Sequence, residues 1–548
     1  MEPIFTDKQL NNMSREDLIS LMKIVQEQTK KKDTEIQLLK DKQKELEFLN
    51  AMLSDRLTLA QRKQFGASSE KYAEGYEQMN LFNEAEASAD AETEELFEEI
   101  RPSSYKRKKR KGKREEDLSN FETVETRTYK LEGEACYCPE CGKKYSVVTK
   151  ETVKRLRFVP AKFEVEEEIT YVYSCPKCGA MKRPEKEPSL IRGSIATPSL
   201  VAGIMNAKYV NGMPLARQER EFARYDLDLS TKTMANWIIN CADRYLKPLY
   251  QLMKEELLES RYIHCDESRI QVLGEPEQKG TTQNWMWVYL TDEFSGSPQM
   301  VLFDYERTRA GYHPVNFLGN RFHGYLTCDG YQAYHSLGEG IIISGCLTHA
   351  RRRFDAALTA LKKDFTKEQL KETVAYQAMS RIGILYKIEE MLHDKTPEEK
   401  YEERQKQSRP VMDAMFEWLH TMEDSVDRSS LIGDAILYTL NQEAYLKRYL
   451  EDGHLSIDNN SAERALKNFA VGRRNWLFAK SVRGAGASAL VYSITETALL
   501  NHLKPYAYLT YILDELRKMG AFPKEEELKK LLPWSEDLPE YCRTKLKK

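Results

Sequence analysis

Apolar residues recur with a seven-residue period over about residues 15–60. Leu39, Leu46 and Leu53 occupy one seam position, and the polar Asn50 falls at the other. This pattern predicts either a coiled coil that joins copies of the chain or an amphipathic helix that folds back on its own chain. Because a polar seam residue can fix register and oligomer state, we favour a self-associating coiled coil at residues 1–72.

The periodicity disappears after the heptads, and charged residues replace it. Residues 84–99 are strongly acidic, whereas the run KRKKRKGKR (106–114) is almost purely basic. Few apolar side chains are available to form a core, which predicts a mostly disordered linker at residues 73–118. The basic run is either a solvated tail or a contact to the DNA backbone. The DNA hypothesis involves Lys106, Arg107, Lys108, Lys109 and Arg110.

Residues 197–260 have a helical pattern. It predicts a first helix, a turn near Tyr225 to Leu229, and a second helix from Thr231 to Asn240 with Ser230 as its N-cap. The arrangement resembles a helix-turn-helix, which is a DNA-binding motif. A helical bundle that packs on the next domain explains the same pattern equally well.

Strand patterns begin at Arg261. The segments RYIHCDESRIQVL, NWMWVYLTD and QMVLFDYERTR predict three consecutive strands, because they are rich in β-branched and aromatic residues. A short connection at residues 310–320 leads to a fourth strand, GYLTCDG, and GIIISG supplies a fifth that runs into a helix. The mostly polar residues 356–452 are predicted to be a helical insertion, after which another helix returns to the sheet. This order predicts an RNase H-like α/β domain.

Three carboxylates occupy related places in these elements. Asp266 lies on the first strand, Asp329 at the end of the fourth, and Glu463 on the returning helix. Mg²⁺ prefers oxygen ligands, and a pair of such ions supports in-line attack on a phosphodiester. We therefore predict that Asp266 bridges two Mg²⁺ ions, for which Mn²⁺ can substitute. Asp329 and Glu463 are each predicted to bind one of the two ions. Asp458 competes with Glu463 but stands where an N-cap is expected, and Glu267 would point to the opposite face of its strand.

Paired cysteines mark a separate metal site. Cys138 and Cys141 form one CPxCG motif, and Cys175 and Cys178 form another after 33 intervening residues. Two such motifs complete a tetrahedral Cys₄ shell, which predicts one structural Zn²⁺. Between them, KFEVEEEITYVYSC alternates apolar and polar residues like a strand that brings the second pair back. A redox-active cysteine pair is the alternative, although it would not need two matched motifs.

Basic residues interleaved with an aromatic ring follow Glu463. This composition suits a phosphate backbone and an unstacked base, whereas the alternative is a solvated helical face. The segment CLTHARRRF follows the fifth strand, and its lone CxxH spacing lacks the second half of a zinc site. DNA contact is predicted there instead. The candidate DNA-binding residues are Arg464, Lys467, Arg473, Arg474, Trp476, Lys480, His349 and Arg352.

The bulk composition limits the class of protein. At 548 residues the chain is too long for one core, so several domains are expected. The net charge of −3 conceals segregated acidic and basic runs, so it does not argue against nucleic acid as a partner. Ten cysteines in a chain of this length argue against a disulfide framework. No signal peptide or membrane-spanning apolar run is evident, so we expect a cytoplasmic location without membrane contact.

Together the patterns predict a multidomain α+β protein with eight segments. They are the coiled-coil helix (1–72), the linker (73–118), a zinc-ribbon-like Cys₄ β module (119–190), a helix-turn-helix-like helical domain (191–260), the first part of an RNase H-like core (261–355), an all-helical insertion (356–452), the second part of the core with the Glu463 helix (453–500), and a helical tail (501–548).

The order of motifs along nearly the whole chain resembles the bacterial insertion-sequence transposases of the IS66 (TnpC) type. The motifs are FGASSEK, the paired CPxCG, KYVNGMPLARQE, CDES, CDGY, CLTHARRRF, DNNSAERALKNFAVGRRNWLFA, PYAYLTYIL and LLPW. The resemblance implies that Asp266, Asp329 and Glu463 are a DDE catalytic triad. It also implies that the zinc module and N-terminal helices serve DNA-end binding and assembly, that the element encodes accessory proteins, and that the protein acts at the nucleoid.

Three functions are compatible with these features. The leading hypothesis is a DNA transposase that hydrolyses at element ends and joins the freed 3′-hydroxyls to target DNA. A structure-specific nuclease would use the same fold without strand joining, and a zinc-ribbon DNA-binding regulator would have no catalysis. The three carboxylates argue against the regulator, and the heptads, linker and zinc module argue against a bare nuclease.

Overall fold

The computed structural model describes residues 163–174, 181–276, 282–362, 364–520 and 523–545, together with residues 140, 143, 176 and 178. The predicted heptad helix, the linker with Lys106–Arg110, and Cys138, Cys141 and Cys175 lie outside the described residues. Within the described part, the chain divides into two compact units. The sheet unit contains residues up to 346, residues 396–398 and residues from 451 onward, and the helical unit contains residues 347–395 and 399–450.

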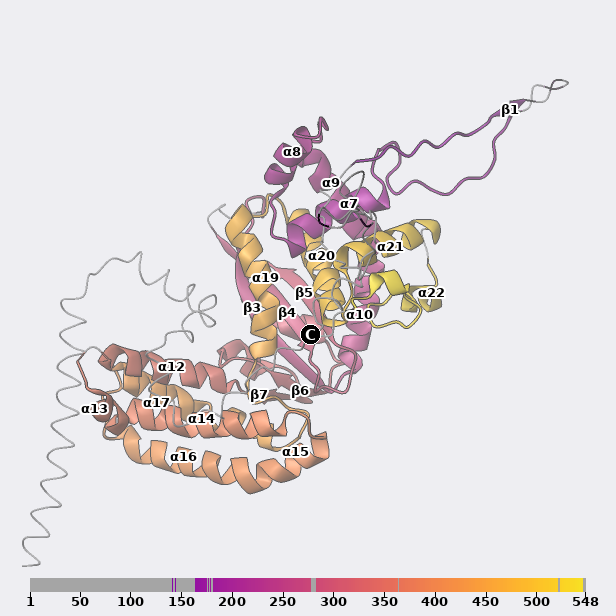
Figure 1. The fold of residues 1–548 in the computed structure, drawn as a ribbon. Helices are drawn as coiled ribbons and strands as arrows, with labels where there is room; N and C mark the ends of the chain where they lie inside the picture. Colours follow the sequence, from indigo (N-terminus) through magenta and orange to yellow (C-terminus); the bar gives the residue numbers. More distant parts are fainter. Residues whose placement is uncertain are drawn as a thin grey trace, which may run out of the picture. The chain divides into compact units, whose positions relative to one another are not determined.

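A five-stranded mixed sheet forms the core of the sheet unit (Figure 1). Its strands are β3 (Tyr262–Gln271), β4 (Gln283–Thr291), β5 (Met300–Glu306), β6 (Gly324–Thr327) and β7 (Ile341–Ser344), in the spatial order β5-β4-β3-β6-β7. The central β3 pairs antiparallel with β4 and parallel with β6; β4 and β5 are antiparallel, and β6 and β7 are parallel. The five strands expected from the sequence are therefore present in the expected chain order.

Helix α20 (Val482–Leu500) covers the β5 edge of the sheet. The Ser493 hydroxyl accepts a hydrogen bond from the Phe303 N–H at 2.8 Å, and the Thr497 hydroxyl accepts one from the Val301 N–H at 3.0 Å. These bonds satisfy backbone donors that an edge strand otherwise leaves unpaired. All residues from 491 to 498 are buried, which explains why this part of α20 has no charged face toward solvent.

The two faces of the sheet carry different helices. On one face, α19 (Asn460–Trp476) packs against β3 and β4. On the other, α11 (Tyr312–Leu318) stacks Phe317 on Tyr289 of β4, with ring centroids 3.7 Å apart. The short connection expected at residues 310–320 thus contains a helix, because Phe317 and Leu318 bury their side chains in the core.

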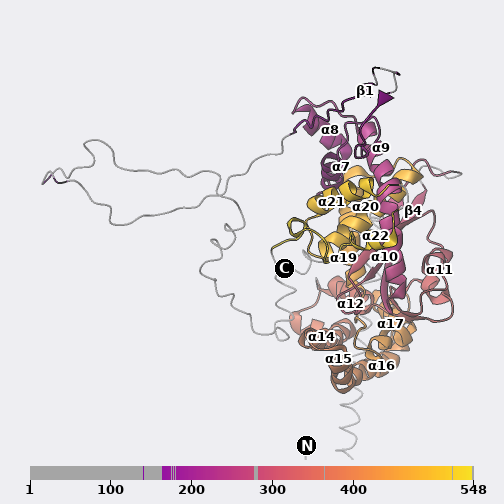
Figure 2. The same cartoon turned by 90° about the vertical axis from the view of Figure 1, so that its right-hand side faces the viewer.

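Helices also precede and follow the sheet in the sequence. The elements before it are α7 (Pro198–Met205), η3 (Asn206–Val210), α8 (Leu215–Ala223), α9 (Thr231–Cys241), η4 (Ala242–Leu246) and α10 (Lys247–Glu259). The elements after α20 are α21 (Pro505–Lys518), α22 (Glu525–Lys529) and η8 (Glu540–Cys542). A short helix, η5 (Gln332–Ser336), lies between β6 and β7. Ser230 caps α9 as predicted, since its hydroxyl accepts from the Thr233 N–H at 3.2 Å. Figure 2 shows α10 beside α20 and α22, with which it packs.

The helical unit contains helices and no strand among its described residues. α12 (Leu347–Leu361) packs against α14 (Val374–Leu392) and α17 (Leu431–Asn441), and α16 (Arg409–Glu423) packs against the same two helices. Its other elements are α13 (Lys367–Glu372), α15 (Pro397–Glu403), η6 (Arg404–Ser408), α18 (Glu443–Leu446) and η7 (Lys447–Leu450). In the part of the chain that the structure describes, no helix is long and apolar enough to span a membrane.

A two-stranded ladder precedes all of these helices in the sequence. β1 (Tyr173–Ser174) pairs antiparallel with β2 (Met181–Lys182), on either side of residues 175–180. The strand expected over Lys162–Cys175 is therefore much shorter than predicted, because residues 163–172 are exposed and adopt no strand. A β pattern forms a strand only where a partner satisfies its backbone groups, and none of the described residues pairs with this segment.

Gly324 allows β6 to approach β3. A Cβ atom at this position would lie 2.2 Å from the carbonyl oxygen of Arg261 and 2.9 Å from its carbonyl carbon. Gly324→Ala must therefore displace backbone, and we expect it to lower the unfolding free energy by about 2 kcal/mol, a usual cost of overpacking. Denaturant unfolding followed by circular dichroism measures this loss. Gly338→Ala is the control, because no atom lies within 4 Å there; equal losses in both variants would contradict the explanation.

Candidate active site

Three segments far apart in the sequence meet at the start of α19. The Asn459 side chain donates from Nδ2 to the carbonyl oxygen of Cys265 in β3, at 2.8 Å, and its Oδ1 lies 3.0 Å from Nδ1 of His264. The Asn459 backbone N–H donates to Sγ of Cys346, at 3.2 Å. Asn459 is fully buried, so these bonds fix the start of α19 against β3 and against the segment that follows β7.

His264 is held at both ring nitrogens. Its Nε2 lies 3.0 Å from the carboxylate of Asp292, which also accepts from the Ser456 hydroxyl at 2.9 Å. Asn459 presents Oδ1 to Nδ1, because its Nδ2 already donates to a carbonyl group, so both nitrogens of His264 must donate. Burial by itself would lower the pKa of His264, but the contacts with Asp292 and Asn459 outweigh it and raise the pKa. The result is a buried imidazolium–carboxylate pair.

The three predicted carboxylates come together beside this contact. Asp266 lies on β3, Asp329 follows β6 by two residues, and Glu463 lies in the first turn of α19. Burial raises the pKa of Asp266 well above its usual range, and the negative charges of Glu267, Asp329 and Glu463 raise it further. Like charges at short range oppose the ionisation of Asp266.

Glu267 occupies the opposite face of β3 from Asp266, as strand alternation requires. Its carboxylate forms an ion pair with Arg309, at 2.5 Å, and accepts a hydrogen bond from the Tyr334 hydroxyl. Arg309 also lies 3.9 Å from the Asp329 carboxylate. Burial and the Asp329 charge raise the pKa of Glu267 to about 7, although Arg309 opposes the shift. Arg309 therefore links Glu267 to Asp329.

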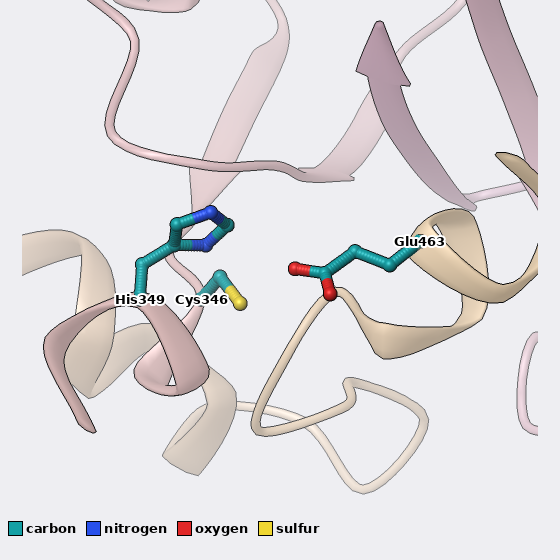
Figure 3. Close-up of side chains that lie close together, drawn as sticks. All are labelled: Cys346, His349 and Glu463. Carbon is teal, nitrogen blue, oxygen red and sulfur yellow. The ribbon is translucent and has the colours of Figure 1, made fainter. Parts of the chain in front are cut away.

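Glu463 faces a cysteine. A carboxylate oxygen of Glu463 and Sγ of Cys346 lie within 4.8 Å, and Figure 3 shows the two groups pointing toward one another. Glu463 is buried, with 8% of its surface exposed. Asp458, the competing candidate, accepts from the Asn460 backbone N–H at 3.1 Å and from its side chain at 2.8 Å. The N-cap position itself belongs to Asn459, so Asp458 supports the helix start from one residue earlier.

The predicted DNA-binding residues near Glu463 lie along α19 and just after it. Arg473 is partly buried and donates to the carbonyl oxygen of Arg269 in β3. Trp476 packs edge-on against Tyr209, with ring centroids 6.3 Å apart, so protein contacts occupy part of its ring. The exposed members of the set are Arg464, Lys467, Arg474 and Lys480.

The other predicted site residues belong to other elements. His349 and Arg352 are partly buried in the first turns of α12, within the helical unit. Of the four predicted zinc ligands, Cys178 alone lies within the described residues, and it is exposed between β1 and β2.

The sequence patterns did not single out the residues that position the carboxylates. These are His264, Asp292, Asn459 and Arg309. A signal existed for His264, because a polar ring in the apolar run YIHC needs a buried partner. Arg309 offered no such signal, since its contacts come from β3 and from the segment after β6.

Comparison with known families defines the class of the protein, a transposase. Residues 193–487 match the family described as Transposase IS66 family. Because this match covers more than half of the chain, the chain belongs to that family. Three further matches agree: residues 135–179 match the zinc-finger binding domain of transposase IS66, residues 493–534 the IS66 C-terminal element, and residues 52–122 the Transposase C of IS166 homeodomain. The resemblance seen in the motifs is thereby confirmed.

Two curated relatives come from Sinorhizobium fredii (strain NBRC 101917 / NGR234). Uncharacterized protein y4hP is 31% identical over 412 residues, covering 72% of this chain and 73% of the relative. Uncharacterized protein y4jD is 29% identical over 417 residues, covering 74% of this chain and 78% of the relative. The likeness therefore extends over most of both chains, well beyond the segment that carries the carboxylates.

Removal of the Asn459 side chain tests its structural role. Asn459→Ala leaves His264 and the Cys265 carbonyl group without their buried partner, so we expect a loss of about 2 kcal/mol of unfolding free energy. Chemical denaturation measures the loss. Asn236→Ala provides the control, because Asn236 is exposed on α9. If the two variants unfolded at the same denaturant concentration, the contact would not be what holds α19 on β3.

Proposed function

We propose that the protein is a DDE-type transposase that hydrolyses phosphodiesters at the ends of an insertion sequence and transfers the 3′-OH ends into target DNA. The observation that carries the proposal is the approach of Asp266, Asp329 and Glu463, from three separate segments, to one partly buried acidic point. The order β5-β4-β3-β6-β7, with β3 antiparallel to β4 and parallel to β6, supports an RNase H-like domain as the scaffold.

The residues at this point are of the type that binds divalent cations. Three carboxylates supply the oxygen ligands that Mg²⁺ and Mn²⁺ take, and their mutual repulsion favours a cation among them. We propose that Asp266 contacts both ions and that Asp329 and Glu463 contact one each. Two ions held in this way would activate the attacking water or 3′-hydroxyl and stabilise the leaving oxygen.

The protein's own side chains position the carboxylates and the DNA. Asn459 holds the first turn of α19 on β3, which keeps Glu463 close to Asp266. Arg309 contacts Asp329 and limits the directions that its carboxylate can take. Basic residues then hold the DNA backbone through its phosphates. The proposed DNA contacts remain Lys106, Arg107, Lys108, Lys109, Arg110, His349, Arg352, Arg464, Lys467, Arg473, Arg474, Trp476 and Lys480.

The proposal also includes the zinc module and the N-terminal heptads. Cys138, Cys141, Cys175 and Cys178 hold one structural Zn²⁺ in the segment that matches the zinc-finger binding domain. The β1–β2 ladder on either side of residues 175–180 supports a metal knuckle in that turn. The N-terminal heptads join copies of the chain, and accessory proteins encoded by the same element act with it.

Divalent ions should stabilise the protein through these carboxylates. Wild-type protein melted in EDTA should gain thermal stability when Mg²⁺ or Mn²⁺ is added, by about 2.7 kcal/mol at 100 times the dissociation constant. Asp266→Asn removes one of the repelling charges, so it should melt higher than wild type in EDTA and lose most of the metal-dependent gain.

Two matched variants identify the third ligand in the same assay. Glu463→Gln should lose the metal-dependent gain, whereas Asp458→Asn should keep it, because Asp458 bonds to Asn460 at the helix start. The reverse result would assign the third position to Asp458. A full gain in Asp266→Asn would contradict the metal site itself.

Cleavage and joining assays test the activity. Full-length protein with Mg²⁺ should nick DNA that carries the element's ends and join the freed ends to target DNA, and Asp266→Ala should abolish both steps because it removes the proposed bridging ligand. Cutting without joining would favour the nuclease. If Asp266→Ala bound DNA as well as wild type, and wild type did not cleave DNA with any divalent ion, the protein would instead be a zinc-ribbon DNA-binding regulator.

A further inference from the structure

An apolar tip, Leu477 and Phe478, follows the C-terminus of α19. The two residues are consecutive and exposed, with 65% and 42% of their surfaces accessible. Single exposed apolar residues are common, but two in succession at the end of the helix that carries Glu463 need an explanation. Leu477 also has a φ of +63°, where the Cβ atom of a leucine is crowded by its own backbone. Such strain persists where the surrounding structure enforces it, often at functional sites.

The apolar tip is held firmly on both sides. The Leu477 N–H donates to the carbonyl oxygen of Arg473 at 2.7 Å, which closes the end of α19. Two residues later, Ala479 bonds to the end of β3: its N–H donates to the Gln271 carbonyl group at 2.9 Å, and its carbonyl group accepts from the Leu273 N–H at 3.0 Å. A helix end and a strand end therefore present the tip in one fixed conformation.

Basic side chains lie beside the tip. Arg473 bonds to the Arg269 carbonyl group, and burial, followed by the positive charges of Arg474 and Arg269, lowers the pKa of Arg473. The Arg269 guanidinium lies 5.7 Å from the ring centroid of Trp285. Lys480 is exposed two residues after Phe478. Like charges that the fold holds together attract an anion, and a DNA backbone supplies a regular series of phosphates.

The apolar tip and the carboxylates lie along the same pair of elements, β3 and α19, which run side by side (Figure 1). From Glu463 to Leu477 along α19, at about 1.5 Å per residue, the span is roughly 20 Å. From Asp266 to Val272 along β3, at about 3.3 Å per residue, the span is also roughly 20 Å. One strand of DNA advances about 3.4 Å per nucleotide, so the span corresponds to about six base pairs.

We infer that Leu477 and Phe478 form a wedge that enters a base step of duplex DNA about six base pairs from the phosphate that is cleaved. Arg269 and Arg473, which lie between the carboxylates and the tip in sequence order along β3 and α19, hold the intervening phosphates. The inference rests on the proposed function and adds that the protein unstacks its DNA. The flanking arginines favour DNA, rather than a second copy of the chain, as the occupant of the tip.

Base unstacking can be measured with 2-aminopurine, whose fluorescence rises when it leaves the stack. The probe is placed at successive positions in duplexes carrying the element's ends, after the cleavage site has been mapped, and full-length protein is added without divalent ions. Wild type should give one maximum about six base pairs from the cut. Leu477→Ala with Phe478→Ala should lower that maximum at least fivefold, and a mismatch built into the same step should restore cleavage by the double variant.

Two further variants separate the wedge from a structural role. Leu477→Gly should raise the melting temperature, because glycine takes a positive φ without strain, and yet it should lower the fluorescence maximum. Leu500→Ala, in α20 and 37% exposed, should change neither quantity.

The outcomes distinguish the wedge from the proposed function. Cleavage that depends on Asp266 without any local fluorescence maximum, or with a maximum that the double variant keeps, would overturn the wedge alone. A double variant that changes the number of subunits and not the fluorescence would assign the tip to a protein contact. Absence of DNA binding by wild type would overturn both the proposed function and the wedge.

Discussion

The hydrogen bond between the Asn459 side chain and the Cys265 carbonyl group determines where α19 begins on the sheet. Apart from residues 396–398, the chain leaves the sheet unit after Cys346 and returns to it at residue 451, so sequence proximity cannot place Glu463. Asp452, which accepts from the Tyr262 hydroxyl at 2.5 Å, attaches the returning segment to β3, and Asn459 then completes the attachment. The position of the third carboxylate therefore depends on a buried polar contact rather than on apolar packing alone.

The site contains several arrangements that oppose stability. Burial and neighbouring negative charges raise the pKa of Asp266, which means that its ionised form is disfavoured in the fold. Leu477 adopts a positive φ at the far end of the same helix. Hydrogen bonds between Ala479 and the end of β3 hold the segment that follows Leu477. Cations among the carboxylates would relieve the charge repulsion at Asp266.

Local patterns predicted the elements well where burial is periodic. The five strands and the Ser230 cap are present, because alternation and capping depend on residues a few positions apart. The predictions were wrong or incomplete where a distant partner decides the outcome. Residues 163–172 alternate between apolar and polar side chains but adopt no strand. Residues 310–320 contain α11, whose Phe317 ring stacks on Tyr289 of the sheet. The predicted zinc site and heptad helix lie outside the described residues and stay predictions.

The sequence by itself determined the family, the strands, and the three carboxylates that the structure brings together, since each depends on motifs or periodicities within one short segment. Only the tertiary structure decided that Asn459 joins α19 to β3, that Arg309 links Glu267 to Asp329, and that Leu477 and Phe478 are exposed beside Arg473. The physical reason is that a sequence pattern shows which side chains need a partner, whereas the partner itself comes from a segment that only the folded chain brings near.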